Sequence, residues 1–237
     1  MYKIQGLISK SVNNVETQIE RMGQNTSNAA NLNTNGYKSV RFEQILNANG
    51  YLETVERVDH SQGSLYKTLR NLDVAIEGNG YFPVTTSSGE IMYTRDGMLK
   101  IGKDGYLFTN RGELVGDGIK IPPNHKKIEI TEDGKVNIYM ESNEKFTNVG
   151  TIPVVYFDNP EGLKRAEGNN FIATAESGEP KLNKNHGLIR QGFIEHSNVD
   201  IYNTIHDVAR INTSVLASSK MLQVFDKLYT RGVMLTE

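Results

Sequence analysis

The two ends of the chain carry the same spacing of apolar positions. Near the start, apolar side chains recur at intervals of three and four residues, at Ile8, Val12, Val15, Ile19 and Met22. This spacing places them in one stripe along a helix and is typical of a heptad seam. Near the end, the same spacing recurs at Ile201, Ile205, Val208, Val215 and Leu222, with Asn212 at an interrupted seam position. We therefore predict that terminal helices over 1–36 and 198–237 pair as a coiled-coil module.

Between these helices, short apolar runs alternate with turns that contain glycine. Runs of strand length occur at 72–76, 91–94 and 136–139, and Asp-Gly pairs such as 96–97 and 133–134 separate runs of this kind. Turns every eight to twelve residues indicate a small antiparallel barrel or sandwich. The sequence therefore predicts a mainly β middle domain over 71–197, flanked by the two long helices. Residues 37–70 mix polar side chains with glycine and predict an extended connector.

Asparagine recurs every three residues towards the end of the first predicted helix. Asn25, Asn28 and Asn31 would line one side of the last helical turns, and Asn35-Gly36 predicts the helix stop. One interpretation is a fraying helix end. The other is a row of amides that fixes the register of a helix-helix contact.

Composition narrows the class of protein. The net charge is −2, which gives no electrostatic case for nucleic-acid binding, since a binder needs a basic face or stripe. The chain has no cysteine, which excludes disulfides and thiolate metal sites. No apolar run has the length of a membrane span or of a secretory signal, so we expect no membrane insertion and export without a cleaved signal peptide.

The sequence motifs do not predict a catalytic, cofactor or metal site. Gly78-Asn79-Gly80 is followed by a predicted strand, whereas a dinucleotide loop opens a helix. No histidine pair has the spacing of a zinc site. His196, Ser197 and Asp200 are the residue types of a hydrolase triad, but their place at a predicted helix start favours capping. We therefore expect a protein that is not an enzyme and needs no cofactor.

A series of sequence blocks resembles one protein family closely. The first reads Asn-Ala-Ala-Asn-Leu-Asn-Thr-Asn-Gly-Tyr-Lys at 28–38, and the others lie at 72–82, 93–97, 158–163, 168–171, 177–180 and 191–200. In this order they resemble the bacterial flagellar rod and hook proteins. Ala29 and Asn35 depart from the family signature, where a bulky apolar residue and proline are usual. Arg210 and Asn212 fall where the family's last helix carries the same residue types.

The resemblance implies a structural subunit of the flagellar basal-body rod. Such subunits pass through the flagellar type III export apparatus and polymerise into a helical tube around the export channel, with the terminal helices as the inner layer. The implied partners are copies of the chain, related rod and hook subunits and the export apparatus, with contact to peptidoglycan or the bushing ring as a further option. The implied location is the rod of the basal body, in the periplasmic space.

Two questions of function stay open at this point. The brief segment after Lys38 favours a proximal-rod subunit, with the distal rod as the alternative that an extended hairpin over 42–70 would favour. A glycan-binding or peptide-binding β domain with oligomerising helices is the alternative from another class, and would require a concave aromatic surface with convergent polar groups. We expect the assembly interface to comprise Ile8, Val12, Val15, Ile19, Met22, Asn28, Asn31, Asn33, Gly36, Ile201, Ile205, Val208, Asn212, Val215 and Leu222.

Overall fold

The structure is a computed structural model that describes residues 2–140, 146–182 and 187–234, with side chains from residue 6 to residue 231 within these ranges. The chain divides into two compact units. The helical unit comprises Met1–Asn31, Ser39–Asp59 and Val199–Glu237, and the β unit comprises Leu32–Lys38 and His60–Asn198. Both units are therefore assembled from segments that are distant in the sequence.

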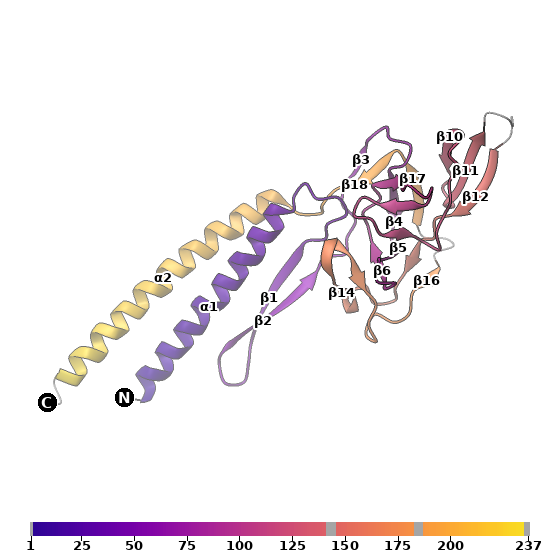
Figure 1. The fold of residues 1–237 in the computed structure, drawn as a ribbon. Coiled ribbons are helices and arrows are strands. Elements are labelled where there is room, and N and C mark those ends of the chain that lie inside the picture. Colours follow the sequence, from indigo (N-terminus) through magenta and orange to yellow (C-terminus); the bar gives the residue numbers. More distant parts are fainter. Residues whose placement is uncertain (1, 141–145, 183–186, 235–237) are drawn as a thin grey trace. The chain divides into compact units, whose positions relative to one another are not determined.

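The helical unit consists of two long helices and one hairpin. Helix α1 spans Tyr2–Ala30 and helix α2 spans Ile201–Met234, and they lie side by side (Figure 1). Asp200 caps α2, because its Oδ1 accepts hydrogen bonds from the backbone N–H groups of Tyr202 at 2.9 Å and Asn203 at 3.1 Å. A cap at this helix start was expected from Ser197 or Asn198, and the structure shows Asp200 in that role. Helix α1 ends at Ala30, several residues before the predicted stop at Gly36.

The hairpin corrects part of the predicted connector. Strands β1 (Val40–Leu46) and β2 (Leu52–Val58) pair in antiparallel register, with Val40 opposite Val58 and Leu46 opposite Leu52. The polar residues of 37–70 concealed a strand alternation in which Val40, Phe42 and Gln44 share one face. These residues are more buried than Arg41 and Glu43 between them.

The β unit contains one large sheet and several short pairs. The large sheet has the strand order β14-β15-β6-β5-β9-β8-β7, and a second sheet has the order β10-β11-β12. The pairs β17-β4, β18-β3 and β13-β16 complete the unit. The strand bounds are β3 Leu65–Lys67, β4 Val74–Gly78, β5 Phe82–Thr85, β6 Ile91–Thr94, β7 Leu99–Ile101, β8 Leu107–Thr109, β9 Leu114–Val115, β10 His125–Ile130, β11 Lys135–Met140, β12 Phe146–Thr151, β13 Val155–Tyr156, β14 Lys164–Arg165, β15 Phe171–Ile172, β16 Lys181–Leu182, β17 Gly187–Gln191 and β18 Phe193–Glu195.

One apolar core connects the two larger sheets. Val74, Phe82 and Leu107 come from the central part of the β unit, and Ile128 and Ile138 come from the three-stranded sheet, all within one buried cluster. The middle of the chain is mainly β, as predicted. Of the two predicted forms, barrel or sandwich, the closed barrel is wrong for the described residues, because the seven-stranded sheet ends at β14 and β7 and does not close on itself. Two short 3-10 helices, Pro160–Gly162 and Glu167–Asn169, lie in this unit.

Candidate assembly interface

Helix α2 turns a regular face inward. Thr204, Ile211 and Ser218 are buried at intervals of seven residues, and Val208 and Val215 between them are half-buried. In contrast, Ile205 is 61% exposed, and Asn212 is also exposed. Of the predicted seam positions, Val208 and Val215 are thus half-buried, while the fully buried row lies one residue earlier than Ile205 and Asn212.

The shift of one residue has a physical reason. The prediction chose Ile205 over Thr204 because isoleucine is more apolar, yet Thr204 and Ser218 are small enough to be enclosed where another element packs closely. Ser218 Oγ accepts a hydrogen bond from Asn14 Nδ2 of α1 at 3.3 Å. Arg21 and Asp207 form a second link between the helices at 3.5 Å. Polar contacts therefore help to align the two helices.

Helix α1 also contacts the hairpin. Asn13 pairs with the backbone of Leu52 in both directions, donating from Nδ2 to the carbonyl at 3.1 Å and accepting from the N–H at 2.7 Å. Thr17 is buried and accepts a hydrogen bond from Gln44 Nε2 at 3.3 Å. The predicted stripe is therefore divided, since Ile8, Val15 and Met22 are half-buried while Val12 and Ile19 are exposed.

Asn28 shows what the predicted row of amides does. Its Nδ2 donates to the Val40 carbonyl at 2.8 Å and its Oδ1 accepts from the Val40 N–H at 3.0 Å. The side chain is buried and acts as an extra strand partner for the start of β1. Asn31 Nδ2 bonds to the Ser27 carbonyl within the same turn, and Asn33 is exposed. The amide of Asn28 thus joins helix α1 to the hairpin. This differs from both interpretations given above, a fraying helix end and a contact between two helices.

The pairing of Asn28 with Val40 leads to a testable prediction. Replacing Asn28 with Ala removes both side-chain bonds and leaves the buried N–H and C=O of Val40 without them, so we expect a loss of about 2 to 3 kcal/mol of helical-unit stability. Asn33→Ala, at an exposed site, is the matched control and should change stability by less than about 0.5 kcal/mol. Hydrogen exchange of the Val40 amide measures the effect, and equal protection in both variants would contradict it.

Apolar side chains remain on the outer faces of both helices. All but Val12, which is 40% exposed, are half exposed or more. They comprise Leu7, Val12, Ile19, Tyr202, Ile205, Leu216, Met221, Val224 and Leu228. Exposed apolar side chains that repeat along a helix pair are candidates for contact with another chain. None of the described helices is long and apolar enough to cross a membrane.

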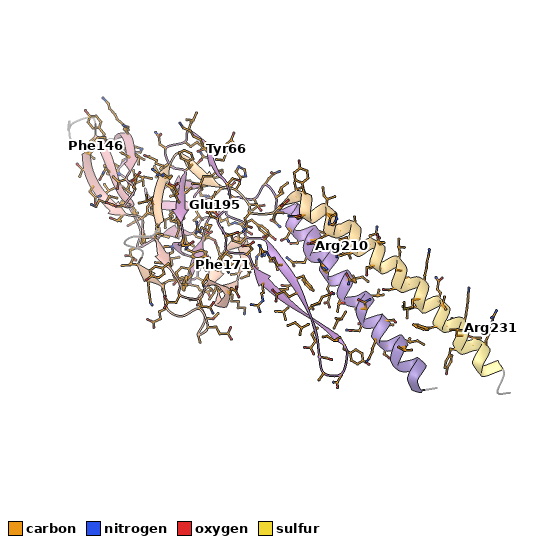
Figure 2. All side chains as sticks on the ribbon, turned by 180° about the vertical axis from the view of Figure 1, so that it is seen from behind. Tyr66, Phe146, Phe171, Glu195, Arg210 and Arg231 are labelled. Carbon is orange, nitrogen blue, oxygen red and sulfur yellow. The ribbon has the colours of Figure 1, made fainter. Side chains whose placement is uncertain are left out.

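The β unit contains a buried ion cluster formed by Lys38, Arg95 and Glu195. Lys38 Nζ lies 2.6 Å from Glu195 Oε1, and Arg95 Nη1 lies 2.9 Å from Glu195 Oε2. All three side chains are essentially inaccessible to solvent. Figure 2 shows Glu195 inside the β unit, among side chains from several strands. A buried carboxylate that neutralises two cations is strongly coupled to both, because losing it leaves charges in a poorly solvated site.

The buried ion cluster joins three segments of the β unit that lie close in sequence to the boundaries with the helical unit. Glu195 Oε1 also accepts from the Gly63 N–H at 2.9 Å, and Lys38 Nζ donates to the Ser61 carbonyl at 2.6 Å. The Gly36 N–H donates to the Glu195 carbonyl at 2.8 Å. The β-unit segments around residues 36–38, 61–63 and 195 are therefore bound to one another through a single glutamate.

Two glycines allow this close approach. Gly36 has a φ of +66°, and a Cβ there would lie 2.5 Å from the Asp96 backbone nitrogen. A Cβ on Gly63 would lie 2.0 Å from the His196 carbonyl oxygen. Neither distance is compatible with a side chain, so Gly36 has a packing role in the β unit as well as a turn conformation.

The buried ion cluster was not predicted from the sequence, although each of its members lies in one of the blocks quoted above. Lys38 ends the first block, Arg95 lies within 93–97 and Glu195 lies within 191–200. The available signal was a charged residue directly after an aromatic or apolar one, as in Tyr37-Lys38 and Ile194-Glu195. Spacing along the chain carried no information, because Lys38 and Glu195 are 157 positions apart.

Asp96, beside the buried ion cluster in sequence, leads to a pH prediction. Burial raises the pKa of its carboxyl group, opposed by the Met98 N–H that donates to Oδ1 at 3.1 Å and by the charge of Arg111. Because the pKa of Asp96 is higher in the folded chain than its unfolded value of 3.8, the protonated carboxyl group stabilises the fold in full below pH 3.8. This stabilisation is lost as the pH rises through the pKa of Asp96 in the folded chain. Urea unfolding should therefore show that Asp96→Asn gains stability relative to the natural chain between pH 4 and pH 7. A constant difference across this range would contradict the prediction.

The comparisons with known proteins cover most of the chain. A family model described as "Flagellar hook protein FlgE/F/G D1 domain" matches residues 75–138. The chain is 31% identical over 231 residues to the flagellar basal-body rod protein FlgG of Buchnera aphidicola subsp. Baizongia pistaciae, covering 85% of this chain and 88% of that protein. It is 28% identical over 251 residues to FlgG of Bacillus subtilis, covering 91% and 92%. It is 31% identical over 185 residues to FlgF of Mesorhizobium japonicum, covering 73% of each.

These matches, with two long helices that contact each other and a mainly β unit, define the class of flagellar axial proteins. Within that class, the chain belongs to the family of flagellar basal-body rod proteins. The family is structural and not enzymatic, and its members assemble with other rod and hook subunits in the flagellar basal body. The preference for the proximal rod is not supported, since FlgG proteins from several organisms match 85% to 91% of the chain.

Proposed function

We propose that this chain is the distal-rod subunit of a flagellar basal body. The observation that carries the proposal is the match to FlgG relatives along most of both chains, since FlgG is usually the distal rod. The hairpin Val40–Val58 adds support, because an extended hairpin in this segment favours the distal rod over the proximal one. In this role the chain has no catalytic site and acts by transmitting torque.

Assembly depends on the two terminal helices in this proposal. Helices α1 and α2 of each subunit pair as a coiled coil, and these pairs form the inner layer of a tube that surrounds the export channel. The exposed apolar residues, Val12, Ile19 and Ile205 among them, contact neighbouring subunits. Burying a side chain of this size gains roughly 1.5 to 3 kcal/mol, and the gain repeats in every subunit of a tube whose head-to-tail contacts do not close. The full set of interface residues predicted from the sequence remains part of this proposal.

Export and location complete the proposal. The chain passes through the flagellar type III apparatus without a cleaved signal peptide and assembles in the periplasmic space. The absence of cysteine suits this route, because no disulfide has to be avoided in the cytoplasm or formed after export. Contact with peptidoglycan or with the bushing ring is a further option for the outer surface of the β unit.

A deletion strain tests the position in the rod. We expect cells that lack this chain to make the membrane ring and a short proximal rod, but no full-length rod and no hook, as seen in purified basal bodies by electron microscopy. Restoring the full-length gene should restore the hook. A strain that stops at the ring with no rod would place the chain in the proximal rod, and a strain with complete rods would overturn the proposal.

A further inference from the structure

A pocket of about 410 Å³ lies beside the buried ion cluster, within the β unit. Its lining includes Asn79 and Tyr81, from the turn into β5, together with Arg95, Phe157 and Asp158. This volume falls in the range of small-molecule sites, which combine apolar walls with a few polar groups. The pocket is the kind of concave aromatic surface that the alternative binding function requires.

Arg95 gives the pocket its chemical character. The side chain is 2% exposed, and its Nη atoms bond to Glu195 Oε2 at 2.9 Å and to the Gly78 carbonyl at 2.7 Å. Its Nε is buried and has no hydrogen-bond partner among the described residues. The carboxylate that neutralises Arg95 is shared with Lys38. Nη1 also donates to the Ile76 carbonyl at 3.3 Å, so the guanidinium would attract a further anion by its positive charge at the pocket wall and not through the inaccessible Nε.

The residues that line the pocket indicate what kind of molecule would carry the anionic group. The rings of Tyr81 and Phe157 meet edge to face with centroids 6.1 Å apart. Burial raises the pKa of the Tyr81 phenol, so this group is neutral at physiological pH and adds no negative charge. Among the described lining residues Arg95 is the only arginine or lysine, which favours one negative charge over a doubly charged phosphate. Aromatic walls favour an organic body over an inorganic ion.

We propose that this pocket binds a carboxylate carried on a small apolar body, with the carboxylate directed to Arg95 and the body packed against Tyr81 and Phe157. Two sources share this chemistry: a free organic acid, and an acidic side chain of a neighbouring polypeptide chain. The proposal goes beyond the role in the rod, because the pocket is complete within one subunit and can be tested on unassembled protein.

Titration with benzoate and benzamide tests the proposal. The two probes have nearly the same shape, but only benzoate carries a charge. We expect benzoate to bind the full chain with a dissociation constant of about 1 mM at low salt, and benzamide to bind at least about tenfold more weakly. Amide chemical shifts of Asn79 and Gly80 report binding. Equal affinities for the two probes, or no shift with tens of millimolar benzoate, would overturn the proposal.

Two substitutions at the rim of the pocket should shift the affinity in opposite directions. Asp158 is 64% exposed and pairs with Lys181. Asp158→Asn removes a negative charge near the bound carboxylate and leaves the Lys181 cation unpaired, so it should tighten benzoate binding by about threefold. Asn79→Asp adds a like charge and should weaken it by a similar factor. Neither residue belongs to the buried ion cluster, so both variants should fold. Unchanged affinity for benzoate in both would show that charge is not recognised here.

Polymerisation in the presence of the same probes separates the two sources. If a neighbouring chain supplies the carboxylate, benzoate should slow polymerisation of the purified chain while benzamide leaves the rate unchanged. If the ligand is a free acid, polymerisation should be indifferent to both probes although benzoate still binds. Either result, together with binding of benzoate, supports the pocket as a carboxylate site.

Discussion

Replacing Glu195 with Gln should destabilise the β unit by about 3 to 5 kcal/mol, the cost of breaking a buried ion pair by removing one partner. The glutamine keeps the shape of the side chain but leaves Lys38 and Arg95 without their shared negative charge. The NH₂ group of the glutamine would also face either Lys38 or Arg95, so two hydrogen-bond donors would meet without an acceptor. Urea unfolding of the full chain, followed by tyrosine fluorescence because the chain has no tryptophan, measures the loss.

A matched control separates this effect from the chemistry of the substitution. Glu77 pairs with Arg190 at the surface, where the glutamate side chain is 50% exposed. Glu77→Gln should therefore change stability by no more than about 1 kcal/mol. Adding Lys38→Met to Glu195→Gln should recover part of the loss, because it removes one uncompensated buried charge. Equal losses from the two glutamine variants would contradict the importance given to the buried ion cluster.

Replacing Ile211 with Ala should destabilise the helical unit by about 2 to 5 kcal/mol. Ile211 is 2% exposed and lies on the inward face of α2, so the shorter side chain leaves a cavity beside α1. The decrease in helical circular dichroism with temperature measures the change, and the transition of the Ile211→Ala chain should shift to lower temperature.

Ile205→Ala is the control on the same helix. Ile205 is 61% exposed, so its truncation should change the stability of the single chain by less than about 0.5 kcal/mol. Under the proposed function it should instead weaken polymerisation, measured as a higher critical concentration. A larger loss of chain stability from Ile205→Ala than from Ile211→Ala would restore the register predicted from the sequence.

The sequence was informative where a local pattern determines structure. The heptad spacing at both ends indicated α1 and α2, and runs such as 91–94 and 136–139 are close to the bounds of β6 and β11. The register of α2 was missed because apolarity favoured Ile205, whereas packing against another element selects the smaller Thr204. The strand β1 was missed because its exposed face is charged and its pairing with Asn28 is not visible in a local pattern.

The buried ion cluster shows the limit of sequence reasoning more clearly. Lys38, Arg95 and Glu195 each lie in a block that resembles the rod and hook family, and no rule of spacing relates them. Their meeting depends on backbone approaches that Gly36 and Gly63 permit, and these approaches exist only once the β unit has folded. Family resemblance identified the blocks, and the structure supplies the physical reason why three of them contain a charge in a buried place.

Cross-linking between α1 and α2 tests the central claim, that the two ends of one chain form a single helical layer. The natural chain has no cysteine, so Asn14→Cys with Ser218→Cys creates one defined cysteine pair. In the natural chain, Asn14 Nδ2 and Ser218 Oγ lie 3.3 Å apart, so the two side chains already meet. Val12→Cys with Ile205→Cys, both at exposed positions, is the control pair. We predict that mild oxidation joins positions 14 and 218 within one chain, in the monomer and in assembled rods, and leaves the control monomer unlinked. Failure to link 14 with 218, or links between different chains alone, would contradict the account.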